Sequence, residues 1–435
     1  MRPLALLVCA AAVAAADDDP VIVLMRLRDR VLEQRQRIPN HTCVETVERL
    51  RYQRVPEQAS RSCDTILARR AQPNFSQLLR PDTTDRLRLD VAFSGYREMY
   101  SWAGAERFEE GDIDELIPEG AIGTGAFASL LLAAFERQPP RFVFDGETHL
   151  DATRALQYSF DVPLEDSQYH YKYNRQVTIT GYSGTLLIDP ETSALLRFTV
   201  RTYELPPSTE ACETDTTLDY GNIHLSGAEF LLPTAARQRF IGREGTESEN
   251  SYTFSSCRDF RAESNIVFGE KPPAAAAKSQ TAAPPQWPAG IRVAIRLATD
   301  VDTDRAAAGD RIEGRLALPL PGPNGSAAFA PGTPVAGRLM RVEVRHHRPV
   351  ETGIALRWEV LDPAGRALPL SLTPDRPVKP AVQLDSAAGV GSLLRRGTEI
   401  ELPRPGEERM ATFRAPGEHH VFESGLLTQW LTVVP

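Results

Sequence analysis

Residues 169–203, YHYKYNRQVTITGYSGTLLIDPETSALLRFTVRTY, decide the fold of this chain. The stretch predicts three antiparallel strands joined by two tight turns, the second at Asp189–Thr192, because apolar and polar residues alternate with a period of two. One face is apolar and the other polar, which is typical of an antiparallel sheet that is covered on one side only. The alternating apolar residues are Tyr169, Tyr171, Tyr173, Val177, Ile179, Leu196, Phe198 and Val200.

Two helices and further strands are expected around this stretch. Residues 21–38 predict an amphipathic helix that Pro39 ends. Residues 42–54 predict a strand, 86–93 and 96–102 a hairpin, and 141–268 a meander of strands. Residues 125–137 predict a helix that is apolar nearly all round and must be buried on more than one face. Its glycine-rich approach leaves two interpretations open, a fixed core helix and a lid that moves over a cavity.

The fold class expected is mainly β, with an α+β first domain. Residues 1–16 predict a signal peptide, and 17–269 a curved antiparallel half-barrel sheet filled by two helices. Residues 270–289 have the Pro/Ala-rich composition of a linker. After the linker, 290–435 show alternation with almost no helical periodicity, which predicts a small all-β barrel.

The N-terminus indicates export. Arg2 precedes a short apolar run, and Ala14–Ala16 offers a cleavage site before three aspartates. Cys9 suggests a lipid anchor as the alternative, although Val8 stands where a small residue is normally required. No later segment approaches the ~18 to 20 apolar residues of a membrane helix. We therefore expect a periplasmic or extracellular protein with no membrane span after signal cleavage.

Four cysteines remain after cleavage, and an even number in an exported chain predicts disulfides. Four cysteines allow three pairings, of which Cys43–Cys63 with Cys212–Cys257 is preferred, because each pair flanks adjacent predicted strands. The sequence contains no C-x-x-C, so neither a zinc site nor a redox pair is indicated.

Charge argues against nucleic acid as a partner. The formal net charge is -9, and the acidic excess lies before Gly290. An acidic stretch at 108–119 does not have the spacing of a calcium loop and is expected to be a solvated loop.

No metal, cofactor or catalytic site is predicted. Asp300, Asp302 and Asp304 alternate, but no glycine follows where a calcium loop needs one. The adjacent pairs His346–His347 and His419–His420 point to opposite faces if they lie on strands, so one pair cannot chelate a metal as a unit. Neither H-E-x-x-H nor G-x-S-x-G occurs. We therefore expect a protein that is not an enzyme, and a hydrolase built on unrecognised loops is the weakest of three hypotheses.

Two families resemble parts of the chain. The helix at 21–38, the interrupting helix at 125–137 and the stretch GYSGTLLIDPETSALLRF at 181–198 resemble the outer-membrane lipoprotein carrier LolA and the N-terminal domain of the sigma regulator MucB/RseB. The resemblance implies an open half-barrel whose concave apolar face takes acyl chains. AGIRVAIRLATDVDTDRAAAGDRIEGRLALPL, FAPGTPVAGRLMRVEV and ALRWEVLDPAGRALPLSL are similar to the C-terminal β-barrel of TrbI-type conjugation proteins. The chain lacks that family's transmembrane segment. The combination of the two domains also resembles uncharacterised secreted bacterial proteins.

The leading functional hypothesis is an exported, non-enzymatic binding protein of the cell envelope that holds a lipid or lipoprotein acyl chain in its first domain. The alternative is a structural or regulatory envelope protein that binds other envelope proteins and has no ligand cavity. The residues predicted to line the hydrophobic pocket are Phe127, Leu131, Phe135, Tyr171, Ile179 and Phe198.

Overall fold

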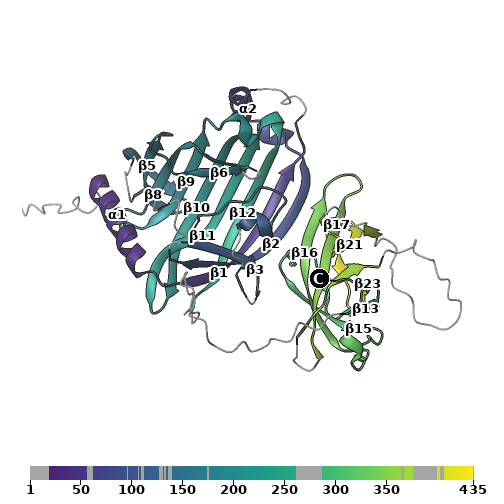
Figure 1. Cartoon of the computed structure of the whole chain (residues 1–435). Coiled ribbons are helices and arrows are strands. Elements are labelled where there is room, and N and C mark those ends of the chain that lie inside the picture. The colour runs from purple at the N-terminus through teal and green to yellow at the C-terminus, as the bar shows by residue number, and fades with distance from the viewer. Residues whose placement is uncertain are drawn as a thin grey trace, which may run out of the picture. The chain divides into compact units, whose positions relative to one another are not determined.

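The structure is a computed structural model, and it describes residues 19–434 apart from 56–61, 96, 106, 109–111, 127–130, 132–133, 136–139, 174–175, 261–286, 364–366, 376–398 and 402–405. The described residues are mainly β-strand, as the sequence predicts (Figure 1). They fall into two compact units: unit 1 is Met1–Pro39 with Gly123–Gly242, and unit 2 is Asn40–Ile122 with Arg243–Pro435. The linker predicted at 270–289 lies almost entirely outside the described residues, so the division of the chain there stays a prediction.

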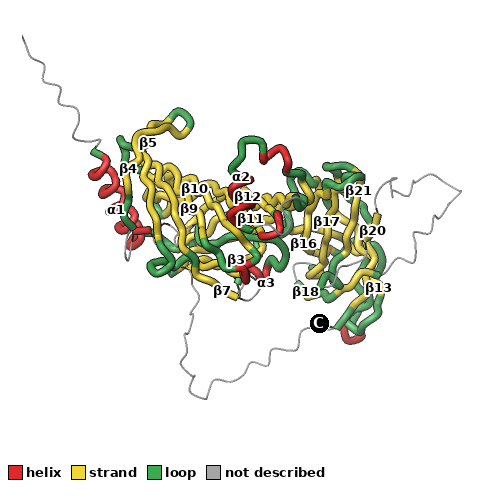
Figure 2. The backbone as a smooth tube through the Cα atoms, turned by 90° about the horizontal axis from the view of Figure 1, so that it is seen from above, coloured by secondary structure: helices red, strands yellow, loops and turns green. Residues whose placement is uncertain are grey.

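The sheet of unit 1 is antiparallel throughout, and its long strands lie side by side in Figures 1 and 2. Its six strands pair in the order β4–β5–β8–β9–β10–β11. They span β4 (Val143–Leu150), β5 (Thr153–Val162), β8 (Gly181–Ile188), β9 (Leu195–Tyr203), β10 (Ala211–Leu225) and β11 (Ala228–Gly242).

The N-terminal helix of unit 1, α1 (Pro20–Arg37), confirms the predicted amphipathic helix. The Asp19 side chain accepts a hydrogen bond from Val21 N, and proline stands in the first turn, where its missing N–H is not needed. Val23, Leu27 and Val31 are buried, whereas Val21 in the first turn is 63% exposed. The Gln34 side chain exchanges two hydrogen bonds with the backbone of Leu231, which holds the C-terminal half of α1 against β11.

The 169–203 stretch forms four strands and not three. Its second half is β8 and β9, paired as expected around the turn at Asp189, whose side chain accepts from Glu191 N. Its first half is a separate two-stranded hairpin, β6 (His170–Tyr173) with β7 (Gln176–Ile179). The break falls before Gly181, where an added Cβ would lie 2.6 Å from the Tyr203 ring. The period-two pattern predicted strands correctly but did not show that the hairpin leaves the main sheet.

In unit 2, β1 (His41–Tyr52) lies between two long antiparallel partners, β2 (Pro81–Ser94) and β12 (Glu247–Asp259). β3 (Arg97–Trp102) completes the predicted hairpin with β2. The α-helices among the described residues of this unit are α2 (Cys63–Arg70) and α3 (Ile113–Leu116), and Phe75–Leu78, Arg243–Gly245 and Pro323–Gly325 are 3-10 helices.

The preferred disulfide pairing is wrong. Cys43 is bonded to Cys257, 214 residues away, and Cys63 and Cys212 are also disulfide-bonded. The prediction joined cysteines that are close along the chain. The pairing is decided instead by the register of β1 on β12, in which Val44 opposes Ser255 and Thr42 opposes Arg258.

The C-terminal strands form an all-β module, as predicted, although the large antiparallel sheet as a whole is not closed into a barrel. Their order is β23–β13–β15–β16–β17, and the segment 368–374 pairs with β17 through β18 and with β23 through β19. The strands are β13 (Arg292–Leu297), β14 (Val301–Asp302), β15 (Arg311–Leu316), β16 (Pro334–Arg345), β17 (Glu351–Leu361), β18 (Leu368–Pro369), β19 (Leu372–Pro374), β20 (Glu399–Glu401), β21 (Ala411–Pro416), β22 (Val421–Phe422) and β23 (Leu427–Thr432).

Two tryptophans fill the core of this module. Trp358 and Trp430 are almost completely buried, and the indole N–H groups of both donate to the Thr428 hydroxyl, at 3.1 and 2.8 Å. Two glycines make room for the six-membered ring of the Trp358 indole. A Cβ atom on Gly314 would lie 2.6 Å from this ring, and one on Gly337 would lie 2.7 Å from it.

Unit 2 also contains a direct pairing between β2 and β16, from Glu343↔Asp85 to Arg345↔Thr83. The Arg86 guanidinium donates to Asp304 O at 2.6 Å, and Arg88 forms an ion pair with Asp310. No helix among the described residues is long and apolar enough to cross a membrane.

Candidate functional site

Three of the six predicted pocket residues come together in the core of unit 1. Leu131, Phe135 and Phe198 belong to one buried cluster, which also includes the apolar side of α1. Phe135 and Phe198 are 1% and 0% exposed, so protein atoms surround both rings. In this packing they are core residues, and a ligand would have to displace a neighbour to reach them.

The other three predicted pocket residues are placed differently. Phe127 lies outside the described residues, as does most of the predicted helix at 125–137. Tyr171 and Ile179 lie on the β6–β7 hairpin and are not members of the buried cluster. Ile179 is 45% exposed and Val177 beside it is 57% exposed, so these two apolar side chains of β7 are open to solvent.

Aromatic rings form a continuous row through the core of unit 1. Phe198 stacks on Phe160 with 5.7 Å between ring centroids, and Phe160 contacts Phe142 at 5.6 Å. Phe142 in turn stacks on Phe135 at 5.3 Å. Phe142 is only half-buried, and the next two residues, Val143 and Phe144, are 47% and 43% exposed. The row therefore runs from half-buried Phe142, beside the start of β4, to the buried Phe198 ring.

A buried carboxyl group in unit 2 was not predicted from the sequence. Glu45, on β1, is 2% exposed, and its Oε1 has no hydrogen-bond partner among the described residues. Burial, and secondarily the nearby Glu98, raise the pKa of Glu45 to about 8. A signal was present in the sequence, because Glu45 alternates with Cys43 and Val47 and so shares the buried face of the strand.

A buried tyrosine, Tyr100, lies close enough to this carboxyl group to interact with its charge. Tyr100 on β3 donates its hydroxyl proton to Glu98 at 2.6 Å. Burial is the main cause that raises the pKa of Tyr100 well above its ordinary value, and the charges of Glu98 and Glu45 add to it. Buried groups with strongly shifted pKa values mark candidate functional sites.

Replacing Glu45 by glutamine is expected to remove a pH dependence of stability. Folded Glu45 keeps its proton to about pH 8, whereas the unfolded group releases it near the ordinary value of 4.5. Between these pH values the unfolded chain binds fewer protons, so the free energy of unfolding should fall by about 1.4 kcal/mol per pH unit in the wild type. Urea unfolding at pH 5, 6, 7 and 8 measures this slope. Equal slopes in the wild type and in Glu45→Gln would contradict the assignment.

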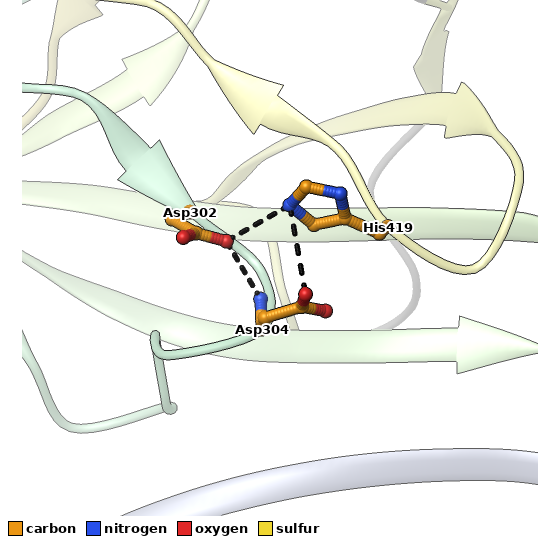
Figure 3. Close-up of side chains that lie close together, drawn as sticks. All are labelled: Asp302, Asp304 and His419. Atoms are coloured by element: carbon orange, nitrogen blue, oxygen red, sulfur yellow. Dashed lines mark hydrogen bonds and ion pairs between the residues drawn. The ribbon is translucent and has the colours of Figure 1, made fainter.

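The described residues contain one group that could hold a metal ion, Asp302, Asp304 and His419 (Figure 3). His419 Nε2 lies 3.0 Å from Asp302 Oδ1 and 3.8 Å from Asp304 Oδ2. A backbone hydrogen bond from Asp304, and then His419, lower the pKa of Asp302. All three side chains are at least about one-third exposed, and the contact of the His419 ring with the Asp302 carboxylate accounts for the arrangement.

The neighbouring histidines have separate partners. His420 packs edge-on against Phe422 at 4.7 Å. His346 Nε2 lies 2.9 Å from the Thr84 hydroxyl, and His347 Nε2 lies 2.8 Å from Asp82 Oδ1. Neither adjacent pair chelates as a unit in this geometry.

Comparison with known proteins adds little to this geometry. No family model and no curated protein matches the chain. Among solved structures, the chain is similar to a DUF1329 family protein from Desulfovibrio piger, with 13% identity, coverage of 56% of this chain and 96% of that chain, and a TM-score of 0.25. A likeness at this level supports no conclusion about fold or activity. The resemblances to LolA and to TrbI-type proteins therefore stay predictions.

Proposed function

We propose that the protein is an exported, non-enzymatic binding protein of the cell envelope that holds a lipid or acyl chain in unit 1. The observation that carries the proposal is the aromatic row from the exposed start of β4 to buried Phe198. An apolar chain that enters beside Phe142 and displaces neighbouring side chains would lie along this row, and each methylene that leaves water contributes about 0.8 kcal/mol.

Two further observations support export and binding. The four cysteines among the described residues are disulfide-bonded, and disulfides persist in oxidising compartments outside the cytoplasm. Phe144, two residues from half-buried Phe142, exposes an apolar ring, and exposed apolar surface often marks an interaction site.

Mass spectrometry of an organic extract tests the proposal on protein purified from its native envelope fraction. We expect stoichiometric lipid with the wild type and none with Phe142→Asp, because a carboxylate at the half-buried midpoint of the aromatic row would lie in the path of the chain. Phe144→Asp is the matched control, since Phe144 is 43% exposed and its ring packs on Tyr158, outside the row, and it should retain lipid. A clean extract from folded wild-type protein would refute the proposal.

The exposed face of the β6–β7 hairpin favours the second candidate function, a structural or regulatory protein that binds another envelope protein. Val177 and Ile179 stand next to each other on this face, and their cross-strand neighbours are Lys172 and His170. If this hypothesis holds, a Val177→Asp/Ile179→Asp variant should lose an envelope partner that co-purifies stoichiometrically with the wild type, and the wild-type extract should contain no lipid.

A further inference from the structure

The outward side of α1 carries apolar side chains that the core does not use. Figures 1 and 2 show α1 at the edge of the strands of unit 1, with one side turned away from them. Val21, Ile22 and Met25 are 63%, 38% and 55% exposed. Met25 follows Ile22 by three positions and Val21 by four, so these side chains are neighbours on the helix surface. Such a group of exposed apolar side chains often marks an interaction site.

Arginines flank the three apolar side chains. Arg26 follows Ile22 by four positions, Arg28 follows Met25 by three, and both arginines are exposed. Because successive residues of an α-helix are turned by about 100°, Arg26 and Arg28 lie on opposite sides of the apolar group. The outward side of α1 therefore has an apolar centre between two positive charges.

The helix is positive, whereas the chain as a whole is negative. α1 contains five arginines against one aspartate and one glutamate, a net charge of +3, and the whole chain has a net charge of -9. Glu33 is paired with Arg37 at 3.0 Å, which leaves Asp29 as the other carboxylate of the helix. This local charge would attract an anionic surface that the chain as a whole repels.

Exposed apolar residues between arginines are typical of helices that lie in the surface of a bilayer. An arginine can extend its apolar stem along the acyl chains and donate hydrogen bonds from its guanidinium group to lipid phosphates. The outward side of a single helix is also convex. A fluid bilayer adapts to a convex surface, whereas a protein partner would need a groove of matching shape.

We infer that the outward side of α1 docks on the surface of a bilayer that contains anionic phospholipid. Val21, Ile22 and Met25 enter the boundary between the head groups and the acyl chains, and Arg26 and Arg28 donate to lipid phosphates. The inference adds a contact surface to the protein and does not depend on a lipid held inside unit 1.

Cosedimentation of the purified protein with vesicles tests the inference. One set of vesicles contains phosphatidylethanolamine and phosphatidylglycerol, and the other contains phosphatidylcholine alone. We expect the wild type to bind the anionic vesicles at least about fivefold more tightly than the neutral ones, because each arginine near an anionic surface contributes about this factor. The net charge of -9 would by itself give the opposite preference.

Two variants assign the binding to α1. Val21→Gln/Met25→Gln should bind the anionic vesicles about tenfold or more weakly, because two apolar side chains no longer leave water. Both positions are exposed and glutamine is a good helix former, so circular dichroism should show an unchanged fold. Arg28→Gln should reduce the preference for anionic vesicles about fivefold.

The matched control is Val177→Gln/Ile179→Gln, which changes two exposed apolar side chains of β7 and should bind vesicles as the wild type does. Absence of vesicle binding by the wild type, equal binding to both kinds of vesicle, or unchanged binding of Val21→Gln/Met25→Gln would overturn the inference. Phe142→Asp should bind vesicles normally, and Val21→Gln/Met25→Gln should retain lipid in its organic extract. Failure of the lipid proposal and failure of the docking surface are therefore distinguishable.

Discussion

Replacement of Phe198 by alanine is expected to lower the free energy of unfolding by about 3–5 kcal/mol. The Phe198 ring is 0% exposed and packs against Phe160 in the core of unit 1. Removing it takes away the burial of the ring and leaves a cavity that the rigid strands β8, β9 and β10 can fill only in part. Urea unfolding followed by circular dichroism measures the change.

Ile179→Ala is the matched control for this substitution. Ile179 was predicted to share the pocket wall with Phe198, but it is 45% exposed on the β6–β7 hairpin. Its replacement should change the stability by less than about 0.5 kcal/mol. Equal effects of the two substitutions would contradict the division between core and hairpin. A loss below about 1 kcal/mol for Phe198→Ala would show that the ring lines an open space.

Removal of the Cys43–Cys257 disulfide is the second change with a large expected effect. The Cys43→Ser/Cys257→Ser variant should lose about 2–5 kcal/mol of stability, because the bond joins residues 214 positions apart and restricts the unfolded chain. Thermal unfolding of the variant and of the wild type under oxidising conditions gives the difference.

The reduced wild type provides the control for this double substitution. Reduction breaks both disulfides, so the melting temperature should fall further in the reduced wild type than in the oxidised Cys43→Ser/Cys257→Ser variant. Peptide mapping of the oxidised wild type should recover a peptide that contains Cys43 bonded to Cys257. Recovery of Cys43 bonded to Cys63 would restore the pairing preferred from the sequence.

The two functional hypotheses assign binding to different apolar residues of unit 1. If lipid is found, the half-buried position of Phe142 makes the start of β4 the route to the core. If the extract is clean, the exposed hairpin residues Val177 and Ile179 are the first to test for contact with a protein partner.

Features that depend on neighbouring residues were predictable from the sequence alone. The alternation in 181–188 and 195–203 and the turn at Asp189 predicted β8 and β9, because a period of two and a local side-chain hydrogen bond are properties of the segment itself. The amphipathic pattern of 21–38 and the proline that follows it predicted α1 for the same reason. The mainly β fold class followed from many such segments.

Features that depend on distant partners were decided only by the tertiary structure. The register of β1 on β12 brought Cys43 to Cys257, and no local pattern carries that information. The same register surrounded Glu45 with apolar side chains from β2 and β12, and burial among them raised its pKa. The hairpin at 170–179 has the same period of two as β8, but only packing determined that Phe198 is buried while Ile179 is exposed. Alternation shows which residues share a face of a strand, whereas the contacts made by that face depend on segments far away in the sequence.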